Sequence, residues 1–181
     1  MCIRDRSKTV RFTAYNLLKA TGRVINGSAY ERLKDSLNRL SGTRIATEIK
    51  TGGQRIASGF GLIDRWEVVE KSEKNNRMVA LEVKLSDWTF NSVKANEVLT
   101  LHPDYFKLRK PLERRLYEIA RKHVGRQSSF KIGLEVLMKK AGVMDLKKKF
   151  RASLRTSIKN DAIPEYKFSL DDTDIVKMTH R

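Results

Sequence analysis

Apolar residues in the first 40 positions follow the spacing of amphipathic helices. Between residues 9 and 20 they recur every three or four positions, at Val10, Ala14, Leu17 and Leu18. This spacing predicts a helix over 9–20 that ends at Gly22. Ser28 and Glu31, three residues apart, fit a capping box and predict the start of a second helix over 29–40. Two helices joined by a short turn that contains glycine are typical of a helix-turn-helix motif.

After Gly42 apolar and polar residues alternate, which is the pattern of β-strands. Four segments show this alternation: 44–49, 56–60, 62–69 and 78–85. The first two flank a turn at Gly52 and Gly53 and predict a β-hairpin behind the helix-turn-helix, which is the arrangement of a wing. The other two predict that the sheet extends beyond this hairpin, and Ser86 is a candidate N-cap for a short helix after it.

The second half of the chain repeats this order of elements. Pro111 fits the first turn of a helix that runs to His123. A basic helix is predicted over 144–159, from an apolar stripe at Leu146, Phe150, Leu154 and Ile158. The other predicted elements are a strand over 128–132, a brief helix around Leu137, and strands over 166–170 and 174–178. Three helices and a two-stranded wing again indicate a winged helix.

The predicted fold class is therefore α+β, a tandem of winged-helix units in which helix-turn-helix motifs carry β-hairpin wings. At 181 residues the chain accommodates two small domains. We expect an N-terminal unit with an extended β wing over 8–100 and a C-terminal unit over 101–181. Residues 1–7 fit neither unit and are interpreted as an artefact or a disordered segment, so Met1 is not expected to be the true start.

The composition adds a strong positive charge to this picture. The chain has 38 Lys and Arg against 21 Asp and Glu, a formal net charge of +17. The excess is present in both halves, so it is not one basic tail, and it predicts a polyanionic partner. No apolar run approaches the length of a membrane span, so a membrane is not an expected partner. The single cysteine, Cys2, excludes an internal disulfide framework and favours the reducing cytoplasm.

The basic helix of the second half is the strongest candidate for contact with double-stranded DNA. Its cationic residues are Lys147, Lys148, Lys149, Arg151, Arg155 and Lys159. The only carboxylate in the predicted helix is that of Asp145, and each cation that neutralises a phosphate adds salt-dependent affinity. Arg151 and Arg155 are the expected base readers, because a guanidinium can donate to both major-groove acceptors of guanine. The alternative is an ordinary solvated helix face.

The first half offers further candidates for DNA contact. Those on its second predicted helix are Ser28, Arg32, Asn38 and Arg39, while Tyr30 fits either a contact or the core. Those at the tip of its predicted wing are Lys50, Gln54 and Arg55, for which an ordinary solvated turn is the alternative. Six aromatic residues are interpreted as core rather than as stacking platforms for bases: Trp88, Phe90, Tyr105, Phe106, Tyr117 and Phe150.

Several strings of the sequence resemble the plasmid replication initiator protein A family. They are LSGTRI at 40–45, TGG at 51–53, FGLID at 60–64, LSDW at 85–88, VLTL at 98–101, and Tyr105-Phe106 leading to KPLERRLYEIARKH at 110–123. The last string is long enough to be specific, and together the strings place the resemblance over about residues 8–181.

The resemblance implies a bacterial initiator of two winged-helix units that binds repeated sites on double-stranded DNA at a plasmid origin. It further implies that the protein helps to open the duplex, recruits a host replication initiator or helicase, and represses its own promoter. Compared with the family pattern, this chain lacks the segment that supplies the first helix of the N-terminal unit. That unit is therefore expected to be incomplete, and whether the fragment forms a homodimer is left open.

The chemistry of an enzyme is not indicated. His102, His123 and His180 are far apart in the sequence, whereas a nicking initiator orients its metal with two closely spaced histidines. No GxxxxGK[ST] string for binding nucleotide phosphates is present. We therefore expect a DNA-binding protein without catalytic residues, cofactor or metal. A winged-helix transcriptional repressor without a role at an origin shares these features and stays open as the alternative.

Overall fold

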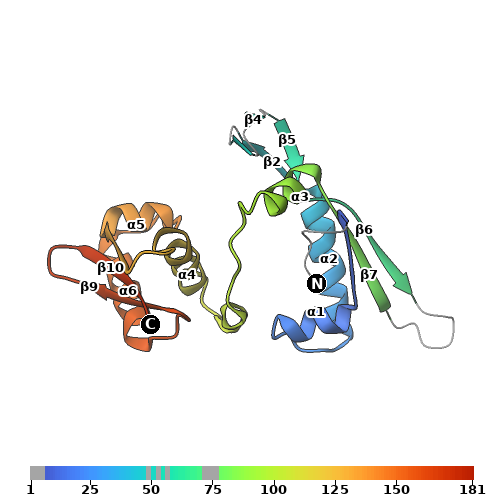
Figure 1. Cartoon of the computed structure of the whole chain (residues 1–181). Helices are drawn as coiled ribbons and strands as arrows, with labels where there is room; N and C mark the ends of the chain where they lie inside the picture. Colours follow the sequence, from blue (N-terminus) through green and yellow to red (C-terminus); the bar gives the residue numbers. More distant parts are fainter. Residues whose placement is uncertain (1–6, 48–49, 52–53, 56–57, 71–77) are drawn as a thin grey trace. The chain divides into compact units, whose positions relative to one another are not determined.

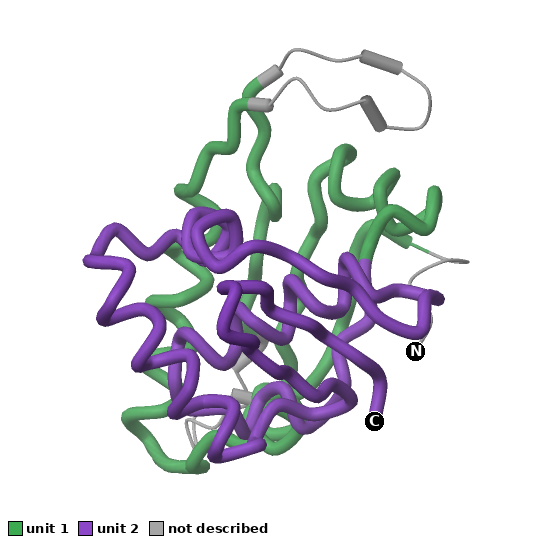
Figure 2. The backbone as a smooth tube through the Cα atoms, turned by 90° about the vertical axis from the view of Figure 1, so that its left-hand side faces the viewer, with its two compact units in different colours: residues 1–98 green, residues 99–181 purple. Residues whose placement is uncertain are grey.

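The computed structural model describes residues 7–47, 50–51, 54–55, 58–70 and 78–181 (Figure 1). The chain divides into two compact units, unit 1 over residues 1–98 and unit 2 over residues 99–181, which have different colours in Figure 2. The boundary expected from the sequence, after residue 100, lies two residues from this division. Within the described residues, no helix is both long enough and apolar enough to cross a membrane.

Unit 1 combines short helices with antiparallel sheets. Its described elements are β1 (Thr9–Phe12), α1 (Ala14–Ala20), α2 (Gly27–Gly42), β2 (Arg44–Thr47), β3 (Lys50–Thr51), β4 (Gln54–Arg55), β5 (Ser58–Gly61), β6 (Ile63–Glu70), β7 (Met78–Leu85) and α3 (Asp87–Lys94). β7 is the central strand of a sheet with β1 and β6 at its sides, while β2 pairs with β5 and β3 with β4. Leu37 of α2 packs against Ile63, Leu81 and Val83, and these residues form the core of the unit.

The helix predicted over 9–20 is wrong in its first part. Its first four residues form β1, which pairs antiparallel with β7 so that Val10 lies opposite Val83. The helix α1 begins only at Ala14, after the N-cap Thr13, whose hydroxyl accepts a hydrogen bond from a backbone N–H of the first turn at 3.1 Å. The β-branched residues before this cap suit a strand, and the strand that pairs with them lies more than 70 residues later.

The capping box predicted at Ser28 and Glu31 is also wrong. α2 begins at Gly27, and its N-cap is Asn26, whose side-chain oxygen accepts a hydrogen bond from the backbone N–H of Ala29 at 2.9 Å. The Ser28 hydroxyl donates to the same oxygen, at 2.9 Å, instead of capping the helix itself. Asparagine and serine are about equally good N-caps, so the extended backbone of Asn26 decides where the helix begins.

Unit 2 has the element order of a winged helix. Its elements are a 3-10 helix (Pro103–Lys107), α4 (Pro111–His123), β8 (Ser129–Gly133), α5 (Leu134–Lys140), α6 (Lys147–Asn160), β9 (Tyr166–Leu170) and β10 (Ile175–His180). β10 lies between β8 and β9 in an antiparallel sheet. The hairpin of β9, β10 and the turn between them is the wing of unit 2, and α5 and α6 form its helix-turn-helix.

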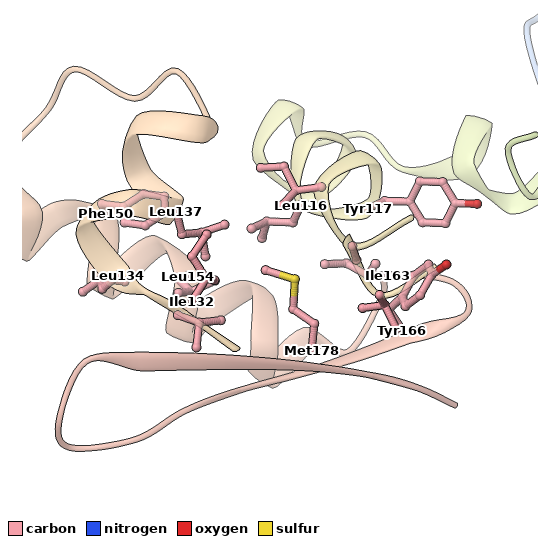
Figure 3. Packing of buried hydrophobic residues seen from close by; sticks show 14 of the residues in the cluster. Leu116, Tyr117, Ile132, Leu134, Leu137, Phe150, Leu154, Ile163, Tyr166 and Met178 are labelled. Carbon is pink, nitrogen blue, oxygen red and sulfur yellow. The ribbon is translucent and has the colours of Figure 1, made fainter. Parts of the chain in front are cut away.

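The core of unit 2 joins the helices to the sheet. Residues from α4, α5, α6 and the wing are fully buried, among them Leu116, Tyr117, Leu137, Phe150, Leu154, Tyr166 and Met178. Figure 3 shows these side chains converging in the space between the helices and the hairpin. The helix α6 therefore has a fixed inward side, which determines the side it presents to solvent.

The beginning of α6 differs from the prediction. The helix starts at Lys147 rather than at residue 144, and Leu146, which was expected in the apolar stripe, is its N-cap and is 67% exposed. A carboxylate oxygen of Asp145 accepts a hydrogen bond from the backbone N–H of Leu146 at 2.7 Å. Because this side chain offers the backbone a local partner, the turn before α6 is favoured over another helical turn.

Candidate nucleic-acid interface

The helix α6 carries a cationic face on the side opposite the core of unit 2. Its inward residues Phe150 and Leu154 are 2% and 0% exposed. At about 100° per residue, Lys148, Arg155 and Lys159 lie within about 40° of one another on the opposite side. All three are exposed, and within the described part of the chain none of them makes a hydrogen bond or an ion pair. We refer to these three residues as the outward cations.

Small residues separate the outward cations. Ala152 and Thr156 are exposed on the same side of α6, and the Thr156 hydroxyl donates to the carbonyl of Ala152 at 3.0 Å. A helix with short side chains between long cationic ones can approach a groove closely. Methyl groups such as those of Ala152 and Thr156 can also contact the methyl group of thymine.

Two further cations of α6, Lys147 and Arg151, lie on the side of the wing and are paired. The Lys147 ammonium lies 2.8 Å from a carboxylate oxygen of Glu135 and 3.2 Å from Oδ2 of Asp174, and Arg151 donates to the same Oδ2. The hydrogen bond to Glu135 is the main cause that raises the pKa of Lys147, so this side chain stays charged. The expectation that only Asp145 offsets the helix is therefore wrong, because the fold brings two carboxylates from elsewhere in the chain.

Lys149 is paired locally and lies away from the outward cations. Its ammonium is 3.3 Å from a carboxylate oxygen of Asp145, four residues earlier, and both side chains are more than half exposed. The pKa of Asp145 is lowered, first by the hydrogen bond from the backbone N–H of Leu146 and then by that from Lys149. An exposed pair of this kind contributes little to stability and leaves Lys149 able to exchange its partner for a phosphate.

The helix α2 of unit 1 presents a mixed surface. The residues predicted there as DNA contacts are all exposed: Ser28, Arg32, Asn38 and Arg39. Arg32 and Arg39 share the side opposite the buried Leu37, but Asp35 lies on that side too. Tyr30 is half-buried. Because a carboxylate interrupts the positive face, α2 is a weaker site for a polyanion than α6.

The residues predicted at the wing tip of unit 1 lie together on one short hairpin. Lys50 is opposite Arg55 and Thr51 is opposite Gln54, across β3 and β4. Gly52 and Gly53, which were predicted to form the turn, and the side chains of β3 and β4 lie outside what the structure describes.

The wing of unit 2 is acidic at its tip, a feature that the sequence analysis did not use. Its turn carries three aspartates, Asp171, Asp172 and Asp174. One carboxylate oxygen of Asp171 accepts the backbone N–H of Ile175 at 2.8 Å, and this bond is the first cause that lowers the pKa of Asp171. Asp172 is exposed, with no hydrogen bond or ion pair to any described residue. The signal in the sequence for this acidic tip is the run of aspartates that follows the basic helix.

The predicted core role of the aromatic residues is confirmed at some positions and wrong at one. Tyr117 and Phe150 are 0% and 2% exposed, and in unit 1 the rings of Phe60 and Trp88 stack with centroids 4.1 Å apart. Phe106 is 39% exposed, because in the 3-10 helix the neighbouring Tyr105 packs against the core instead. Among the described residues, no three histidine, cysteine or carboxylate side chains are grouped as a metal site would require.

The sequence of this chain matches known replication proteins. Residues 3–168 match the family model of Replication initiator protein A. A "Putative replication protein" of Wigglesworthia glossinidia brevipalpis is 37% identical over 161 residues, which make up 88% of this chain and 58% of that relative. The chain thus spans less than two thirds of the length of the relative.

The fold of this chain matches two solved initiator structures. A crystal structure of domains 2 and 3 of RctB has a TM-score of 0.65 and 12% identity, over 99% of this chain and 77% of that one. The Pi initiator protein, solved in complex with iteron DNA, has a TM-score of 0.68 and 15% identity, over 98% of this chain and 81% of that one.

These matches confirm two predictions made from the sequence, the fold class and the family. The structural matches confirm the predicted α+β fold class of tandem winged-helix units. The family match extends over most of the chain and agrees with the resemblance seen in its motifs. The chain therefore belongs to the Replication initiator protein A family.

Proposed function

We propose that this chain binds double-stranded DNA at repeated sites of a plasmid replication origin. The observation that carries the proposal is the face of α6, where the three outward cations stand without a carboxylate partner among the described residues. Family membership supports a role in replication initiation. The Pi initiator protein, which shares the fold, was solved on iteron DNA, and this supports duplex DNA as the ligand.

In the proposed complex α6 is the recognition helix and lies in the major groove. Arg155, between the other two outward cations, donates to O6 and N7 of a guanine, because a guanidinium matches both acceptors at once. Lys148 and Lys159 contact phosphates on either side and add a salt-dependent affinity that is the same for every sequence. Base reading and phosphate binding are thus divided among neighbouring side chains of one helix face.

Both units are proposed to bind the same repeat. Two helix-turn-helix motifs that occupy successive major grooves on one face of the duplex need centres about 10.5 base pairs apart, so a repeat of about 20 base pairs is expected. In unit 1 the contacts come from α2, with Arg32 and Arg39, and from the hairpin of β3 and β4.

We further propose that the protein acts by binding rather than by catalysis, in the bacterial cytoplasm. Bound at the origin, it helps to open the duplex and recruits a host replication initiator or helicase, and a homodimer is one form in which it reaches a repeated site. The scattered histidines of the chain support a function without a metal.

A selection of binding sites from random duplex DNA, at two salt concentrations, tests the proposal. The expected result is one enriched motif that recurs in tandem at a plasmid origin. A motif confined to a promoter would instead indicate a transcriptional repressor, and the enrichment of no motif would leave only nonspecific cationic binding. Arg126→Ala is a matched control for Arg155→Ala, because Arg126 is exposed, lies outside the helix-turn-helix, and has no hydrogen bond or ion pair with a described residue.

A further inference from the structure

Asp174, at the root of the wing of unit 2, is connected to both helices of the helix-turn-helix. Its backbone carbonyl accepts a hydrogen bond from the N–H of Leu134, the first residue of α5, at 2.8 Å. Its carboxylate oxygen Oδ2 contacts Lys147 and Arg151, which lie one turn apart on α6. One residue of the wing therefore bonds to the two elements that would place the recognition helix on DNA.

The environment of this carboxylate makes its cationic partners important. The Asp174 side chain is 22% exposed, the Arg151 side chain is 33% exposed, and the second oxygen of Asp174, Oδ1, is buried without a hydrogen-bond partner among the described residues. A carboxylate that has lost much of its water depends on the cations beside it. Removing the carboxylate therefore leaves Arg151 without its ion-pair partner, and removing the guanidinium leaves the carboxylate with Lys147 as its only cation among the described residues.

The tip of the same wing is poorly suited to contact DNA. Asp171 and Asp172 are exposed, and the backbone hydrogen bonds to Asp171 favour its ionised form. Neighbouring carboxylates repel phosphates, and the turn itself, residues 171–174, contains no cation that would offset them. The turn of the wing therefore needs another explanation than the delivery of positive charge to a groove, although the strands β9 and β10 carry the exposed Lys167 and Lys177.

We propose that the wing of unit 2 is a clamp for the recognition helix and that Asp174 is its positioning residue. The Asp174 carboxylate holds Lys147 and Arg151 at the wing side of α6. Together with the packing of Phe150 and Leu154 in the core, this contact fixes the first half of the helix against the wing, so that the outward cations face the groove. The clamp rests on the proposed function, because both assign the contact with DNA to α6. The variants that test the clamp have expected results that differ from those that test the proposed function.

The test compares Asp174→Asn with Asp172→Asn in the full chain. Each variant removes one negative charge from the same turn, so both are expected to raise affinity for DNA in general. Asparagine tolerates the left-handed backbone of Asp174, whose φ is 64°, so the bond from its carbonyl to Leu134 is expected to remain. The probes are a random duplex of about 30 base pairs and the duplex that the unaltered protein selects, with affinity measured by fluorescence anisotropy over a series of KCl concentrations.

Asp174→Asn is expected to release Arg151, and Asp172→Asn is not. With Arg151 free to reach a phosphate, the slope of log affinity against log salt on the random duplex becomes steeper by about 0.9 than in Asp172→Asn. The preference for the selected duplex falls at least about fivefold, because a misplaced helix loses base contacts. Equal slopes and equal preferences in the two variants would overturn the clamp.

Arg151→Gln provides a second test that does not depend on the stability of Asp174→Asn. If Arg151 belongs to the clamp, Arg151→Gln leaves the slope of log affinity against log salt on the random duplex unchanged. The same variant reduces the preference for the selected duplex. A slope that becomes shallower by about 0.9 would show that Arg151 binds phosphate in the unaltered protein, and would refute the clamp.

The two proposals fail in different ways. If the unaltered protein prefers no sequence, the proposed function fails, while the salt slopes of the three variants on random DNA still decide whether the clamp exists. If the unaltered protein selects a motif and the variants behave alike, only the clamp fails.

Discussion

Arg155→Ala is expected to abolish base discrimination at one position of the site without affecting the fold. The side chain is exposed on α6 and has no hydrogen bond or ion pair with a described residue, so its removal should change the free energy of unfolding by no more than about 0.5 kcal/mol. A bidentate contact to guanine is worth about 1–3 kcal/mol of discrimination. The ratio of affinities for the selected and a base-substituted duplex should therefore fall roughly 5- to 150-fold.

The assay is a competition between these duplexes, repeated over a series of salt concentrations. Because Arg155 is assigned to a base and not to a phosphate, Arg155→Ala should leave the salt slope on random DNA nearly unchanged. Lys159→Gln should do the opposite: it should make the slope shallower by about 0.9 and weaken all duplexes equally. Arg126→Ala, with the same change of charge, should preserve discrimination. If Arg155→Ala discriminates as well as Arg126→Ala does, the assignment of Arg155 to a base is refuted.

The remaining predictions concern the fold and its pH dependence. Leu154→Ala removes a fully buried side chain of α6 and should cost about 2–5 kcal/mol in urea unfolding; a loss below about 1 kcal/mol would contradict the described core. Asn26→Ala should cost about 1 kcal/mol because Asn26 caps α2, and Ser28→Ala should cost less, whereas the reverse order would restore Ser28 as the cap. Burial, together with the hydrogen bond to Glu165, raises the pKa of Tyr117 to about 12. The fold favours the neutral phenol, so its contribution to stability should be complete below about pH 10 and lost as the pH rises to about 12. In urea unfolding Tyr117→Phe should show less of this loss, and an equal loss in both proteins would contradict the assignment.

The elements that the sequence predicts well are those with local signals. Pro111 marks the first turn of α4, and the spacing of Phe150 and Leu154 identifies the inward side of α6. These signals depend only on residues within a few turns of one another. The identity of the basic helix as the candidate interface followed from the same short stretch of sequence.

The features that the sequence did not predict depend on residues far apart in the chain. β1 is a strand because β7 lies beside it, and nothing near Val10 reveals that partner. The pairing of Arg151 with Asp174 joins positions 23 residues apart, so the periodicity of α6 could show that the helix is cationic but not which of its cations are already paired. The choice of Asn26 over Ser28 as N-cap depends on the path of the backbone, which the residue types leave open.

Methylation of guanine N7 in the major groove tests most directly whether the outward cations of α6 read DNA. The protein is bound to its selected duplex, the complex is treated with dimethyl sulfate, and the modified guanines are mapped for the unaltered chain and for Arg155→Ala. We expect the unaltered chain to protect guanines in each repeat and Arg155→Ala to lose protection at one position per site while the others stay protected. Guanines that methylate equally with and without the protein, or a pattern identical in both proteins, would contradict the account.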